Sequence, residues 1–135
     1  MEKKQRLAAS LVEEFVSRAH GGLERVKQLL DQEPALVNAA WDWGAGDWET
    51  ALGAAAHMGR RDNAEHLLAH GARLDIFAAA MLGYTGIVRA LVAQRPDSVS
   101  LLGPHRIPLI VHAEAGGDKA AEVLAFLKKQ VKRSV

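Results

Sequence analysis

The sequence contains no cysteine in its 135 residues, which excludes a disulfide framework and a thiol nucleophile and fits a reducing compartment. Charge of one sign is not in excess either. The 17 lysines and arginines face 16 aspartates and glutamates, so nothing points to nucleic acid as a partner. The chain also lacks an apolar run of membrane-spanning length and the apolar core of a signal peptide. We therefore expect a soluble, cytoplasmic protein without a membrane partner.

Four similar segments, each beginning at a glycine, indicate an internal repeat. They are GGLERVKQLL from Gly21, GRRDNAEHLL from Gly59, GYTGIVRALV from Gly83 and GGDKAAEVLA from Gly116. Apolar residues return at helical spacing in each segment, which predicts one buried stripe per helix. A further apolar helix precedes three of these glycines, and residues 4–20 supply the corresponding helix of an end unit. This pattern predicts an all-α fold of stacked helix–turn–helix units.

The repeating unit resembles that of the ankyrin repeat family. The family's opening pattern, T-P-L-H-x-A, is approximated by TALGAA from Thr50, and its closing pattern, G-A-x-V-N, by GARLD from Gly71. Leu67 and Leu68 match the leucine pair of its second helix. The resemblance covers roughly residues 15–128 and implies an ankyrin-like solenoid. We expect a single domain over residues 1–135, with units at about 4–40, 41–75, 76–100 and 101–130.

Unequal connectors set this chain apart from a regular array. The four glycines lie 38, 24 and 33 residues apart, whereas ankyrin units repeat about every 33 residues. The first connector is long because it holds WDWGAGDWET, and the second is short because a helix follows Asp75 at once. We expect an enlarged finger (a loop projecting between units) at residues 41–50, a missing finger after Asp75, and a last finger in SLLGPHRIP. The missing finger should leave a pocket.

The resemblance also implies which residues face this pocket. In ankyrin arrays the loops and the last turn of each first helix form the concave recognition face. The two positions before each glycine lie there, which are Ala19 and His20, His57 and Met58, Met81 and Leu82, and Glu114 and Ala115. His105 and His112 come from the last unit and its finger. The expected ligand-binding residues are Trp41, Asp42, Trp43, Trp48, Met58, Met81, His105, His112 and Glu114.

Two interpretations stay open for the residues of the long connector. Its three tryptophans either cap the helix stack or serve as platforms for a planar or sugar-like ligand. Asp47, or Thr50, either caps a helix start or takes part in proton transfer within an apolar pocket. In the second case Asp47 and His57 form the leading proton-transfer pair, and Glu49, His105 and Glu114 support them.

Two functions follow from this reading. The resemblance favours a binding domain whose concave pocket takes a small molecule or a segment of a partner protein. The alternative is a small metal-independent acid–base enzyme, a hydrolase of the glycosidase type or a lyase, with Asp47, Glu49 and His57 as catalytic residues. A purely stabilising loop is a third reading. We expect no cofactor and no metal site, because His66 and His70 stand one helical turn apart without a third ligand nearby.

Overall fold

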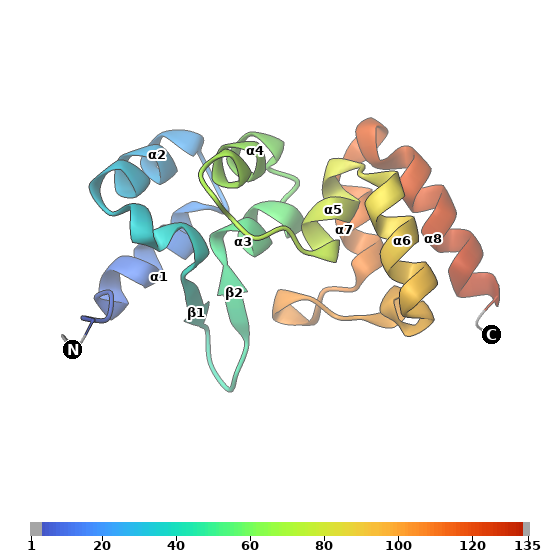
Figure 1. The fold of residues 1–135 in the computed structure, drawn as a ribbon, viewed down its shortest axis with the longest axis horizontal. Helices are drawn as coiled ribbons and strands as arrows, with labels where there is room; N and C mark the ends of the chain where they lie inside the picture. Colours follow the sequence, from blue (N-terminus) through green and yellow to red (C-terminus); the bar gives the residue numbers. More distant parts are fainter. Residues whose placement is uncertain (1–3, 134–135) are drawn as a thin grey trace.

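Helices dominate the part of the chain that the structure, a computed structural model, describes, namely residues 4–133. Eight α-helices in this part follow one another in pairs along the longest axis (Figure 1). The pairs are α1 (Ala9–Arg18) with α2 (Leu23–Gln32), α3 (Ala51–His57) with α4 (Arg61–Ala69), α5 (Ile76–Leu82) with α6 (Thr85–Gln94), and α7 (Leu109–Ala115) with α8 (Ala121–Arg133). The expected all-α class is confirmed in this coarse form, with one small sheet added.

The helices predicted on either side of the glycines are present. Gly59, Gly83 and Gly116 each follow a first helix, and a second helix begins soon after each of them. In the last pair a 3-10 turn, η4 (Gly117–Ala120), precedes α8. The first helix was expected from residue 4 but begins at Ala9, and residues 4–8 form no helix or strand.

Two side-chain caps fix the residues at which α3 and α5 begin, and so limit the length of the loops before them. The Thr50 hydroxyl accepts a hydrogen bond from the Gly53 amide (3.0 Å) and starts α3 directly behind a strand. Asp75 accepts one from the Ala78 amide (2.8 Å) and starts α5. These are ordinary N-cap contacts. Because α5 begins so early, residues 70–75 contain no strand or helix, and the row has no finger there.

The long connector forms a hairpin of β1 (Ala40–Asp42) and β2 (Trp48–Thr50), which projects from the row in Figure 1. Trp41 pairs with Glu49 and Asp42 with Trp48 in antiparallel register. Side chains of paired residues share a face. Trp41 and Glu49 therefore face the helices, while Trp48 lies on the opposite face and is 60% exposed.

Two further 3-10 turns connect the remaining elements. η1 (Pro34–Asn38) joins α2 to the hairpin, and η2 (Pro96–Ser100) follows α6. The loop after η2 is closed by a bridge between Leu102 and Pro108 and contains a third 3-10 turn, η3 (Pro104–Arg106). This loop occupies the place expected for the last finger.

The core runs the length of the row and is centred on alanine-rich helices. One cluster of buried side chains spans α1 to α4 and the second spans α6 to α8, and both include residues of α5. Nearly all of α3 and α5 is buried, because alanine lets neighbouring helices approach closely. The ends of these two helices are therefore firmly held.

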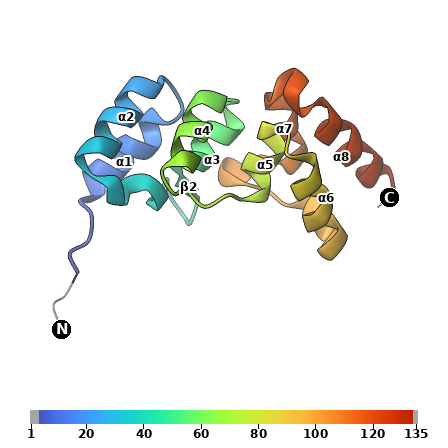
Figure 2. The ribbon, with the colours of Figure 1, turned by 45° about the horizontal axis from the view of Figure 1, so that its top comes forward.

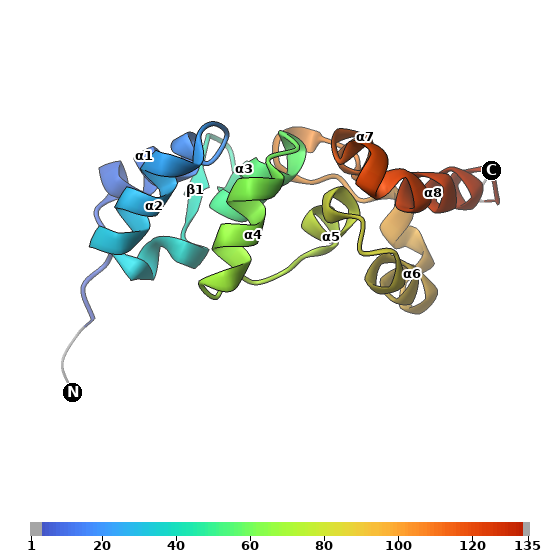
Figure 3. The same ribbon diagram turned by 90° about the horizontal axis from the view of Figure 1, so that it is seen from above.

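Figures 2 and 3 show the row from two other sides, with the two ends of the chain at opposite ends of the row. Within residues 4–133 no helix has the length and apolar character needed to cross a membrane.

Candidate functional site

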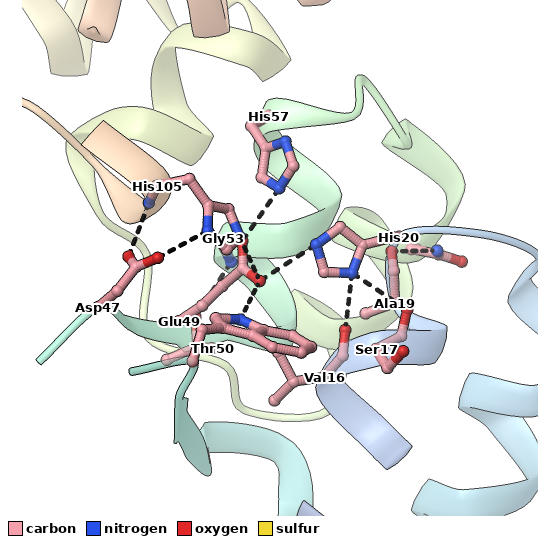
Figure 4. A network of polar contacts seen from close by, with 12 residues as sticks. Val16, Ser17, Ala19, His20, Asp47, Glu49, Thr50, Gly53, His57 and His105 are labelled. Carbon is pink, nitrogen blue, oxygen red and sulfur yellow. Dashed lines mark hydrogen bonds and ion pairs between the residues drawn. The ribbon is translucent and has the colours of Figure 1, made fainter. Parts of the chain in front are cut away.

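A buried carboxylate lies at the centre of three histidines (Figure 4). Glu49 Oε1 lies 3.1 Å from His20 Nε2 and 3.3 Å from His105 Nε2, and Oε2 lies 3.0 Å from His57 Nε2. The indole N–H of Trp43 donates to Oε1 (2.9 Å). The Glu49 side chain is fully buried, whereas those of His20, His57 and His105 are 25%, 11% and 33% exposed. The imidazoles thus separate the carboxylate from solvent but remain accessible themselves.

These side chains come from four elements and meet only in the folded chain. His20 lies in the turn after α1, Glu49 on β2, His57 at the end of α3, and His105 in η3. Asn63 of α4 fixes the first of these turns, since its side-chain amide donates to the carbonyls of residues 19 (2.9 Å) and 21 (2.8 Å).

Hydrogen bonds from Nδ1 of His20 and His105 determine whether Nε2, the nitrogen that faces Glu49, carries a proton. His20 Nδ1 donates to the carbonyls of Val16 (3.1 Å) and Ser17 (3.0 Å). His105 Nδ1 donates to Asp47 Oδ2 (2.7 Å), and the His105 amide donates to Asp47 Oδ1 (2.8 Å). A neutral imidazole with its proton on Nδ1 has a lone pair on Nε2. In their neutral form both rings therefore direct the lone pair of Nε2 at Glu49.

Lone pairs that face a carboxylate require a proton or a cation between them. His57 shows this most clearly, because its Nε2 and Glu49 Oε2 lie 3.0 Å apart without hydrogen-bond geometry. Both atoms are buried and neither has another hydrogen-bond partner among the described residues. Such atoms are costly unless something satisfies them.

The electrostatics of the cluster favour a negative centre. Burial is the largest single influence on Glu49 and raises its pKa, but the contacts with His20, His57 and Trp43 outweigh burial and hold that pKa well below its ordinary value. The hydrogen bond from the His105 amide lowers the pKa of Asp47. Contact with Glu49 raises the pKa of His20. Both carboxylates are therefore ionised at neutral pH, and the cluster attracts cations.

The cluster has the donor set of a metal site. His20, Glu49, His57 and His105 each offer one ligand atom, and the four atoms lie within 4.8 Å of one another. Zinc bonds of about 2.0–2.2 Å place tetrahedral ligands about 3.4 Å apart, so movements below about 1 Å per side chain would close the cluster around an ion. No other such group of three or more potential ligands occurs in residues 4–133.

An open cleft of about 960 Å³ adjoins the cluster and is bounded by the hairpin, the start of α5 and the loop around His105. Asp47 and His105 form the wall that the cleft shares with the cluster. Trp48, Phe77 and Leu102 contribute apolar surface to its other walls. A molecule in the cleft would therefore lie beside the histidines.

Two consecutive residues between the cleft and the cluster have a strained backbone. His105 (φ 59°) and Arg106 (φ 60°) both adopt the left-handed conformation, although neither is glycine. Each such residue costs of the order of 1–3 kcal/mol and persists only where its surroundings impose it. Here Asp47 holds both the amide and the ring of His105. The strain points to a functional role for this loop.

The structure brings most of the expected proton-transfer residues together but pairs them differently. Asp47, Glu49, His57, His105 and Trp43 all lie in or next to the cluster. Asp47 binds His105, while His57 contacts Glu49. Sequence spacing cannot show this, because the hairpin turn and η3 meet only through the fold.

Several expected ligand-binding residues lie elsewhere. Met81 is completely buried in the core, because α5 packs between α3 and α7. Met58 and Glu114 are exposed, and neither supplies a ligand atom to the cluster. Trp41 packs against the core, and Asp42 accepts hydrogen bonds from two amides of the hairpin turn (2.8 and 3.0 Å). These five side chains do not contribute to the cluster.

His20 was expected on the concave face but was not among the expected ligand-binding or catalytic residues, although its position was informative. It occupies the same place before its glycine as Met58 does one unit later, next to the place of His57. Two neighbouring units that each place a histidine at the end of the first helix are the signal that would have identified it.

His112 is a buried histidine outside the cluster. Its Nδ1 donates to the Pro108 carbonyl (2.9 Å), and its ring lies 4.8 Å from that of Phe77. A Cβ on Gly103 would come within 3.1 Å of the His112 ring, so His112 and Phe77 support the loop that carries His105. Burial lowers the pKa of His112.

This burial makes stability depend on pH. Because the folded pKa of His112 lies below its ordinary 6.5, the folded chain binds fewer protons than the unfolded chain as pH falls through 6.5. The free energy of unfolding should therefore decrease on acidification, by at most about 1.4 kcal/mol per pH unit from this group. Denaturant unfolding from pH 7 to 5 should show a shallower decrease in His112→Leu than in the wild type. Equal slopes would contradict this role.

Neither family models, nor curated proteins, nor solved structures match this chain, so the function has to be argued from the cluster and its cleft.

Proposed function

We propose that this protein is a hydrolase that depends on a divalent first-row transition metal, with Zn²⁺ as the foremost candidate. The metal is held by His20, Glu49, His57 and His105. The observation that carries the proposal is the convergence of three imidazole nitrogens on a buried carboxylate, with two of the meeting atoms lacking any hydrogen bond. Mixed imidazole and carboxylate donors suit zinc and its neighbours.

The chain's own residues support this chemistry from the outside of the cluster. Asp47 holds the proton of the His105 ring on Nδ1, and the carbonyls of Val16 and Ser17 do the same for the His20 ring, as outer partners of metal-binding histidines generally do. When bound, the ion would polarise a carbonyl oxygen and lower the pKa of a water molecule. Four protein ligands would fill a tetrahedral site, so water and substrate would have to reach the ion as a fifth ligand, from the side on which His20 and His105 are exposed.

The scaffold of the proposed site is an ankyrin-like solenoid with a ligand-binding concave face. Supporting observations are the succession of helix pairs, the turn glycines between them, and the projecting hairpin. Its fingers differ in length, and the cleft is bounded by the hairpin, the start of α5 and the loop around His105. The ligand is a small molecule, since the cleft has the volume of a small-molecule site.

A metal-free acid–base hydrolase is the second candidate. The chain of contacts from Asp47 through His105 to Glu49 favours it, because it links two carboxylates through one imidazole. In this case Glu49 and the histidines would exchange protons with the substrate directly.

Metal titration separates the two candidates. After removal of metal with a chelator, calorimetry with Zn²⁺ should give one ion per chain, and Co²⁺ should give a visible absorption band. Hydrolysis of 4-nitrophenyl esters should require added metal. His57→Ala should lose metal binding and metal-dependent hydrolysis. His70→Ala, which changes an exposed histidine at the end of α4 outside the cluster, should keep them. Ester hydrolysis that survives chelation and needs no metal would favour the second candidate.

Asp47→Asn is expected to weaken zinc binding by about 10- to 100-fold, the usual effect of losing an outer partner. The amide oxygen can still accept from the His105 backbone, which leaves the NH₂ group facing His105 Nδ1. The ring proton must then move to Nε2, where it blocks coordination. Competition with a chelating dye measures the affinity, and nitrogen NMR of the ring reports the tautomer.

Asp42→Asn is the matched control. It lies in the same hairpin and accepts backbone hydrogen bonds that an amide oxygen can also accept. Unchanged zinc affinity in Asp47→Asn, with the Asp42 variant equally unchanged, would remove Asp47 from the site.

A further inference from the structure

The cleft contains one cation that the described residues do not neutralise. Arg106 lines the cleft, and its guanidinium has no hydrogen bond or ion pair within residues 4–133. Both acids of the cleft are already engaged, Asp47 with His105 and Asp75 with the Ala78 amide. A guanidinium binds carboxylates through two parallel hydrogen bonds. Arg106 is exposed and not engaged by another side chain, so its guanidinium is available to an anion from outside the chain.

The rest of the cleft is suited to an apolar body. Trp48 is 60% exposed and Leu102 is 48% exposed, and both line the cleft together with Phe77. Large apolar side chains that gather around one hollow commonly mark a ligand site. Trp48 faces the cleft because the strand alternation that buries Glu49 turns its neighbour outward.

The strained loop places this cation next to the cluster. His105 and Arg106 are consecutive, both are left-handed, and both line the cleft. His105 contacts Glu49 (3.3 Å), so a group bound by Arg106 lies close to the metal ligands. One small substrate can therefore reach both.

We propose that the substrate is a carboxylic ester that carries a second, free carboxylate and an apolar body. Arg106 binds the carboxylate, the apolar part lies against Trp48 and Phe77, and the ester carbonyl reaches the histidine cluster. Water adds its oxygen to the carbonyl carbon, and the bond from this carbon to the alcohol oxygen breaks. One proton of the water passes to the alcohol and the acid product releases the other, without oxidation or reduction. This assignment rests on the proposed hydrolase function.

Binding tests the recognition step without catalysis. Calorimetry in the presence of a chelator compares 4-phenylbutyrate with its neutral amide, so that no metal ion can account for carboxylate binding. The wild type should bind the carboxylate at least about tenfold more tightly, the scale of one charge-assisted contact. Arg106→Gln should lose this preference, and Arg95→Gln, which changes an exposed arginine away from the cleft, should retain it.

Turnover tests whether Arg106 also selects esters that carry a free carboxylate. With zinc-loaded protein, the monoester of 4-nitrophenol with glutaric acid is compared with 4-nitrophenyl valerate, which has the same chain length without the carboxylate. The ratio of their kcat/KM values should be at least about ten in the wild type and should approach one in Arg106→Gln.

The outcomes distinguish the two proposals. Equal affinity for 4-phenylbutyrate and its amide, or a preference that survives in Arg106→Gln, overturns the substrate assignment even if zinc-dependent turnover of the valerate ester is found. Absence of zinc binding and of turnover overturns the hydrolase, whereas the calorimetric preference still decides whether Arg106 binds a carboxylate.

Discussion

Replacing Glu49 with glutamine is expected to abolish zinc-dependent ester hydrolysis and to weaken zinc binding by more than about 100-fold. Loss of an outer partner already costs about 10- to 100-fold, and Glu49 is the one anionic ligand of the cluster. The amide has nearly the same volume and can still accept the hydrogen bond from Trp43. It cannot supply the negative charge on which three imidazoles converge.

Calorimetry and initial rates measure this effect, and circular dichroism shows whether the helices remain. Glu122→Gln is the matched control, since this glutamate is exposed in the first turn of α8. Zinc affinity that is equal in the Glu49 and Glu122 variants would rule out the metal centre. If Glu49→Gln loses helicity, the test is made with His57→Ala instead, because the His57 ring is partly exposed and its removal disturbs the core less.

Gly83→Ala should destabilise the fold by about 3 kcal/mol or more. Gly83 ends α5 in the left-handed conformation (φ 81°), which costs alanine about 1–2 kcal/mol. A Cβ at this position would also overlap the carbonyl oxygen of Lys119 in the next unit, and backbone cannot give way as a side-chain tip can. The midpoint temperature of thermal unfolding should fall by about 10 °C or more.

Gly86→Ala provides the opposite control. Gly86 lies inside α6, and a Cβ there would meet no atom within 4 Å. Alanine should therefore stabilise the helix by up to about 1 kcal/mol. A similar loss of stability in both variants would show that overlap with the Lys119 carbonyl is not what destabilises Gly83→Ala.

The repeating helices could be predicted from the sequence because their signals are local. Turn glycines, alanine-rich first helices and caps such as Thr50 act within a few residues. The long connector was also expected to hold the site, and the expected residues Asp47, Glu49, His57 and His105 lie close together in the structure. The ankyrin resemblance and the ligand-binding function stay predictions.

The pairing within the site could not be predicted, because it depends on how distant elements meet. Asp47 and His105 lie 58 residues apart in the sequence and meet only because the hairpin and the loop that contains η3 come together in the fold. Met81 was placed on the concave face by analogy of position, but burial on all sides of α5 overrides that analogy. The cluster therefore required tertiary structure.

The hydrogen bonds between Asp47 and His105 also bear on how the chain unfolds. In a row of units that contact only their neighbours, either end can open by itself, and unfolding then loses cooperativity. Here Asp47 of the hairpin before α3 holds the loop before α7, and α3 also packs directly on α7, so the last helix pair is joined to a pair that is not next to it in the chain. Detaching the last unit must break this link and disperse the cluster. The two halves of the row are thereby coupled, so that local unfolding of the last helix pair also displaces His105 from the cluster.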